Sequence, residues 1–133
     1  MRIERIDHIV LTVADITRTC DFYKQVLGMD VVTFGEERTE GRTALQFGAQ
    51  KINLHENGKE FEPKAAHPTP GSADLCFITT TGLDQILERL QAQGVAIVEG
   101  PAQRTGAQGR IESVYLRDPD GNLVEVSRYI DTF

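Results

Sequence analysis

The sequence is poor in cysteine, in long apolar runs and in basic residues, and each shortage excludes a class of protein. Two cysteines, Cys20 and Cys76, among 133 residues are too few for a disulfide scaffold and favour a reducing cytoplasm. No apolar run is long enough to cross a bilayer, and residues 1–8 lack the apolar centre of a signal peptide. A net charge of -6 argues against nucleic acid or an anionic membrane as partner. Small molecules and other proteins remain as candidate partners.

The sequence does contain one pattern of elements twice. The first half predicts a strand, a helix and three strands, at 6–13, 15–27, 29–34, 43–47 and 51–56, with a charged turn at 35–41. The second half predicts the same order, at 74–79, 83–94, 95–98, 110–117 and 122–128, with a glycine-containing loop at 100–109. We therefore expect an α+β fold in one domain, 1–133, with βαβββ modules at 1–56 and 74–130 and a proline-rich linker at 57–73.

Two ionisable side chains stand out on the predicted strands. Glu125 interrupts an apolar strand that follows the tight turn 118–122, and a carboxylate among apolar neighbours needs solvent, a partner or a metal. The plain alternative is an edge strand with one wet face. His8 shares a strand face with Val10, and its plain alternative is a core or edge histidine.

Aligning the two halves gives each of these residues a counterpart. Asn53 is the counterpart of Glu125, and Leu75 or its immediate neighbour is the counterpart of His8. Each helix should cover one face of its sheet, so the two uncovered faces make a cleft. By strand alternation, Cys76 should point toward the helix instead.

Three stretches resemble the vicinal oxygen chelate superfamily, which includes glyoxalase I, fosfomycin- and bleomycin-resistance proteins and extradiol dioxygenases; they lie at 6–13, 22–28 and 117–125. The stretch at 51–79 looks most like the subgroup called glyoxalase domain-containing protein 5. The resemblance implies a glyoxalase/bleomycin-resistance-like curved sheet around a cleft that holds one divalent metal ion, and it implies a homodimer.

The resemblance also implies where the ligands lie, on the first and last strands of each module. It assigns metal binding to His8 and Glu125, while Leu75 has no lone pair and Asn53 is better suited to contact substrate. His55, two residues beyond Asn53, is either a third ligand or a cleft-lining acid or base. As a ligand it completes a two-histidine, one-carboxylate set suited to Ni, Zn, Mn, Co or Fe.

Two arginines flank the predicted glycine-containing loop. Arg104 and Arg110 are candidates for binding a substrate carboxylate or phosphate, and the plain alternative is a connection with solvated charges. His67 lies in the linker, where a solvated loop histidine is the expected reading.

The resemblance implies a metal-dependent lyase or isomerase similar to glyoxalase I, the lactoylglutathione lyase. Such an enzyme transforms a small carbonyl or hydroxy-acid substrate through a metal-stabilised enediolate, with His55 and Glu125 as the expected catalytic residues. Two alternatives stay open: a ferrous-iron dioxygenase, and a metal-free small-molecule binding or resistance protein.

Overall fold

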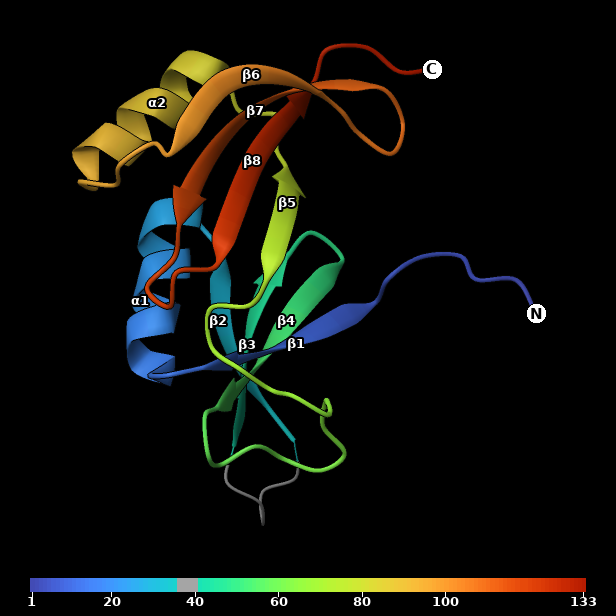
Figure 1. Cartoon of the computed structure of the whole chain (residues 1–133), viewed down its shortest axis with the longest axis vertical. Coiled ribbons are helices and arrows are strands. Elements are labelled where there is room, and N and C mark those ends of the chain that lie inside the picture. The colour runs from blue at the N-terminus through green and yellow to red at the C-terminus, as the bar shows by residue number, and fades with distance from the viewer. Residues whose placement is uncertain (36–40) are drawn as a thin grey trace. The chain divides into compact units, whose positions relative to one another are not determined.

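The computed structural model describes residues 1–35 and 41–133, and the chain divides into two compact units, Met1–Gly71 and Ser72–Phe133 (Figure 1). Each unit has one helix and a four-stranded sheet, in the order strand, helix, three strands. The predicted α+β fold with two βαβββ modules is therefore confirmed. Of the predicted charged turn at 35–41, residues 36–40 lie outside the described part. Neither helix of the described chain is long and apolar enough to cross a membrane.

The first unit pairs its first strand with its last. Its elements are β1 (His8–Val13), α1 (Ile16–Leu27), β2 (Asp30–Phe34), β3 (Arg42–Phe47) and β4 (Gln50–Glu56). The sheet order is β1-β4-β3-β2, with β1 and β4 parallel and the other pairs antiparallel. Side-chain alternation buries Leu11, Val13, Ile52 and Leu54, which leaves His8, Val10 and Asn53 on the other face.

Helix α1 begins and ends where its sequence predicts. The Asp15 carboxylate accepts a hydrogen bond from the Arg18 backbone N–H at 3.0 Å, which caps the first turn. Gly28 ends the helix with a φ of 69°, a left-handed conformation that favours glycine. Cys20 and Tyr23 lie on the buried stripe of the helix, so the Cys20 side chain packs in the core.

The second unit repeats this topology and corrects one predicted strand. Its elements are β5 (Asp74–Ile78), α2 (Leu83–Ala92), β6 (Glu99–Thr105), β7 (Arg110–Arg117) and β8 (Leu123–Tyr129), with the sheet order β5-β8-β7-β6. The strand predicted at 95–98 is wrong, because the strand of the structure, β6, begins at Glu99 and lies mostly in the segment expected to be a loop, 100–109. Gly100 and Pro101 hide the strand pattern, and pairing with β7 across an irregularity between Glu99 and Ala102 determines the strand instead.

A network of hydrogen bonds holds the turn between β7 and β8. The buried Asp118 carboxylate accepts from the backbone N–H groups of Asp120 (2.9 Å) and Asn122 (3.0 Å) and from Asn122 Nδ2 (2.8 Å). Asn122 Oδ1 in turn accepts from the backbone N–H of Ala73 at 2.9 Å. The turn thus connects the start of β5 to the start of β8, the strand that carries Glu125.

Candidate functional site

A hollow of about 490 Å³ lies over the face of the second sheet whose opposite face buries Val114, Val124 and Val126. Residues from all four strands line it, among them Cys76, Ile78, Arg104, Tyr115, Glu125 and Tyr129. Strand pairing explains the grouping, because cross-strand partners share a face. Aromatic and aliphatic walls around a few polar groups are typical of a small-molecule site.

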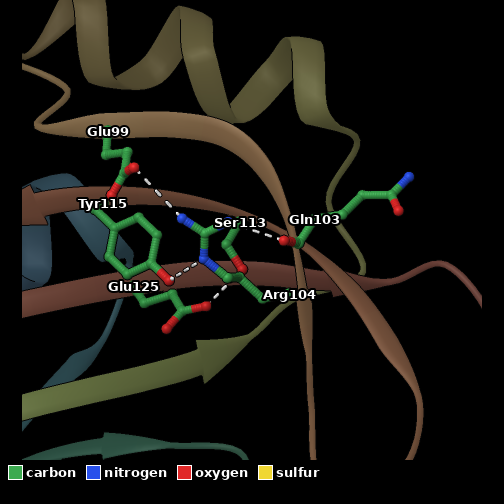
Figure 2. Close-up of polar contacts among 6 residues, drawn as sticks. All are labelled: Glu99, Gln103, Arg104, Ser113, Tyr115 and Glu125. Carbon is green, nitrogen blue, oxygen red and sulfur yellow. Dashed lines mark hydrogen bonds and ion pairs between the residues drawn. The ribbon is translucent and has the colours of Figure 1, made fainter.

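The Glu125 carboxylate is held in this hollow by serine hydroxyls. Ser113 Oγ donates to Glu125 Oε2 at 2.5 Å, as Figure 2 shows, and Ser127 Oγ lies 3.3 Å from the same oxygen. The two serine hydroxyls are themselves 2.6 Å apart, and both serines are fully buried. These contacts fix the orientation of a half-buried carboxylate, as hydrogen bonds around metal-binding carboxylates do.

Tyr115 and Arg104 form a second polar group beside Glu125 (Figure 2). Arg104 Nε donates to the Tyr115 hydroxyl at 3.1 Å, while Arg104 Nη2 lies 3.5 Å from a Glu99 carboxylate oxygen. Desolvation, with the nearby Glu125 charge, raises the pKa of Tyr115, so the phenol stays protonated near neutral pH. Because Tyr115 accepts from arginine, its own O–H proton is directed at another acceptor, and the Glu125 carboxylate is one such acceptor in the hollow.

Cys76 faces the hollow, so the prediction that it points toward the helix is wrong. Its partner in the β5–β8 register is Glu125, and its Sγ lies 3.4 Å from Ser127 Oγ. Burial raises the pKa of this thiol, which keeps it protonated. Side chains alternate along this strand as expected. The alignment of the two halves, however, placed the cleft-facing position at Leu75, one residue away from Cys76.

The same register identifies Asp74 as the counterpart of His8. In the first unit Asn53 pairs with Val10, two residues beyond His8; in the second unit Glu125 pairs with Cys76, two residues beyond Asp74. Asp74, the immediate neighbour of Leu75, therefore occupies the position equivalent to His8. Its carboxylate adds an oxygen donor that the alignment of the two halves did not single out.

His8 lies at the start of β1 with one ring nitrogen already in use. Its Nδ1 is 2.8 Å from Asp7 Oδ2, and the imidazole is partly exposed. This pairing orients the ring and leaves Nε2 available to a ligand, which is the arrangement common for metal-binding histidines. The His8 interaction also lowers the pKa of Asp7, which keeps that carboxylate charged.

Asn53 and His55 share a face of β4 but differ in their distance from His8. Asn53 Oδ1 is buried and has no hydrogen-bond partner among the described residues. His55 pairs with Thr12 in the register, whereas His8 pairs with Lys51, so the two histidines are four residues apart along parallel strands. That offset is about 13 Å at about 3.3 Å per residue.

Arg110 and His67 lie outside the hollow around Glu125. Arg110 forms a two-pronged ion pair with Asp131, with Nε 3.0 Å from Oδ2 and 3.2 Å from Oδ1. This pairing raises the pKa of Arg110 and lowers that of Asp131. His67 is exposed in the connecting segment.

Within either unit, the described residues include no group of three histidine, cysteine, aspartate or glutamate side chains placed to hold one metal ion. Each unit offers two donors at matching positions, His8 with Asn53 and Asp74 with Glu125.

Sequence reasoning missed Tyr115 and the two serines, although a signal for them was present. The predicted hairpin fixes the register once its turn is placed at 118–122, and counting back pairs Tyr115 with Glu125 and Ser113 with Ser127. Polar residues opposite a strand carboxylate were the signal.

The repeated βαβββ unit with a polar hollow defines the class of protein to which this chain belongs. It is a member of the Glyoxalase/Bleomycin resistance protein/Dioxygenase superfamily, whose sequence profile matches residues 5–126.

Individual relatives share most of the chain. Virulence protein STM3117 of Salmonella typhimurium is 58% identical over 130 residues, which cover 98% of this chain and 88% of that protein. Its crystal structure matches with a TM-score of 0.93 over 98% of this chain and 100% of that one. Glyoxalase domain-containing protein RDO1 of Mycosarcoma maydis is 53% identical over 131 residues, covering 98% of this chain and 72% of the relative.

A more distant structure shares the fold alone. Lactoylglutathione lyase from Agrobacterium tumefaciens is 23% identical and matches with a TM-score of 0.70 over 96% of each chain.

Proposed function

We propose that this protein is a metal-dependent enzyme that acts on a small carbonyl or hydroxy-acid substrate, in the manner of glyoxalase I. The single observation that carries the proposal is the Glu125 carboxylate, which lies in a hollow and is oriented through one oxygen by Ser113 and Ser127. A structural carboxylate needs no such hollow, whereas a ligand or base does.

The donor chemistry fits one divalent ion. His8 offers Nε2, with Nδ1 engaged by Asp7, and Glu125 and Asp74 offer carboxylate oxygens. His55 is four residues from His8 in the strand register, which favours a role in lining a pocket over a shared ion. Carboxylate oxygens are harder ligands than imidazole nitrogens. A set of one imidazole and two carboxylates therefore favours Mn²⁺ more than a set of two imidazoles and one carboxylate.

Bound by these residues, the ion would act as a Lewis acid that polarises a substrate oxygen. The other roles fall to side chains of this chain. Tyr115, which accepts from Arg104, donates its proton to negative charge that develops on the substrate. Arg104 attracts a substrate carboxylate, and Asn53 Oδ1 accepts from a substrate hydroxyl.

The proposal includes the way in which the ligands come together. His8 belongs to the first unit and Glu125 to the second, and we propose that both bind the same ion, as residues of one chain or of the two chains of a homodimer. Mixing inactive His8→Ala and Glu125→Ala chains distinguishes the two routes. A site shared across a dimer regains part of its activity on mixing, whereas a site within one chain does not.

Metal analysis tests the proposal. Protein purified without chelator should contain about one divalent ion per complete site, and His8→Ala, Asp74→Ala and Glu125→Ala should each lose it. His67→Ala is the matched control, because it removes an exposed imidazole that does not line the hollow around Glu125, and it should keep the metal.

Activity is then measured with the hemithioacetal of methylglyoxal and glutathione, by following formation of lactoylglutathione. Metal-dependent turnover that disappears in Glu125→Ala supports the glyoxalase-like reaction. Consumption of dioxygen by the iron form would instead indicate a dioxygenase. A folded protein that binds small molecules equally well with and without metal would refute the enzyme proposal in favour of sequestration.

A further inference from the structure

A second hollow, of about 220 Å³, lies within the first unit, on the β1–β4 face that carries His55. Val10 and Thr12 of β1 form its floor beside His55, and part of the connecting segment, 63–68, forms its wall. We propose that this hollow binds a compact, neutral organic group that carries one hydroxyl or carbonyl oxygen, with His55 as its hydrogen-bond partner. The site uses none of the proposed metal ligands, although Val10 of its floor pairs with Asn53, which is proposed to contact the substrate.

The state of His55 is the first argument. The residue is only 7% exposed and lines the hollow, and the contact found for its ring among the described residues is aromatic. Its nitrogens are not among the fully enclosed unpartnered atoms, which means that they are open to the hollow. A buried polar ring without partners is unfavourable, so its open nitrogen should bind water or a ligand in the hollow it lines. Phe61 packs against the imidazole edge to face, with ring centroids 5.5 Å apart, and holds it in place.

The charges around the hollow favour a neutral ligand. Desolvation lowers the pKa of His55, and the positive charge of Arg42 lowers it further. The Arg42 guanidinium lies over the Phe61 ring, 4.4 Å from its centre. The imidazole is therefore neutral near pH 7 and offers one donor and one acceptor. Lys64, the charged residue among the described residues that line the hollow, lies 3.3 Å from a Glu62 carboxylate oxygen, so its charge is already paired.

The size and lining of the hollow define the ligand further. An apolar cavity of about 150 Å³ is enough to bind benzene. The hollow here is larger, at about 220 Å³, and the side chains of Val10, Pro63, Ala65 and Pro68 give it mainly apolar walls. It therefore accommodates a six-membered ring with one small polar substituent, and phenol is a suitable probe.

Histidine NMR tests the site directly. The chain has three histidines, so a sample labelled with 15N-histidine gives three sets of imidazole signals. Titration with phenol should shift the His55 signals saturably at millimolar concentrations and leave those of His8 and His67 nearly unchanged. Equal or non-saturating shifts at all three histidines would overturn the proposal.

Two variants and one control complete the test. Binding of phenol, measured by its own relaxation, should weaken at least tenfold in His55→Gln and in Ala65→Phe, and change less than twofold in His67→Gln. Ala65 is exposed, so filling the hollow from that side keeps the test valid even if His55→Gln does not fold. Retained binding in Ala65→Phe refutes the site, and equal affinity for benzoate refutes its preference for neutral groups.

Discussion

Replacing Ser113 with alanine should loosen Glu125 without removing it. Ser113 is fully buried, and its hydroxyl makes contacts of 2.5 Å to Glu125 Oε2 and 2.6 Å to Ser127 Oγ. A hydrogen bond to a charged group contributes about 1.5–3 kcal/mol and a neutral one about 1 kcal/mol. Ser127 remains 3.3 Å from the same carboxylate oxygen and compensates in part. We therefore expect Ser113→Ala to lower the free energy of unfolding by about 1–3 kcal/mol.

The same substitution should weaken metal binding by about 10- to 100-fold, the usual effect of removing a group that orients a ligand. The assay pairs urea denaturation of the metal-free protein with a Mn²⁺ titration of the folded protein. Thr80→Ala, which removes an exposed hydroxyl from the same unit, is the control and should change neither quantity. An unfolding free energy that falls while Mn²⁺ affinity stays unchanged would refute the assignment of Glu125 as a ligand.

Three further predictions concern other parts of the chain. Tyr115→Phe keeps the ring but removes the hydroxyl donor, so kcat should fall about 10²- to 10³-fold while Mn²⁺ content stays constant. An unchanged kcat would contradict the role of Tyr115 as a hydrogen-bond donor to the substrate. Asn122→Ala removes one hydrogen bond to the buried Asp118 carboxylate and one from the Ala73 backbone N–H, and it should reduce the free energy of unfolding by about 3 kcal/mol, measured in urea. His55 has a lowered pKa from desolvation and Arg42, opposed by Glu60, so its neutral form stabilises the fold above its unfolded pKa of about 6.5. That contribution should be lost as the pH falls below this value, and His55→Gln should show a flatter pH profile.

The fold was predictable because local and global signals agree. A helix with a clear apolar stripe begins after Asp15 and ends before Gly28, and the order of elements occurs twice. β6 was missed because Gly100 and Pro101 have low strand propensity, and only its pairing with β7 makes it a strand.

The site was predictable only in part, because register is a tertiary property. The hydrophobic pattern alone identifies Glu125 as unusual. Loops of different length separate the elements of the two halves, so counting along the chain chose Leu75, while strand pairing selects Asp74. The uses of Tyr115 and Ser113 likewise depend on which residues of β8 they face.

The hydrogen bonds of Asn122 have a consequence for protein that is stored or ages in the cell. One side-chain amide bridges Ala73, immediately before Asp74, and Asp118, at the entry to the turn before Glu125. Deamidation of Asn122 would place a new carboxylate against that of Asp118, and their repulsion would open the turn. Asp74 and Glu125 would then lose their alignment together, so chemical ageing at one amide should weaken the proposed ion site and destabilise the sheet at the same time.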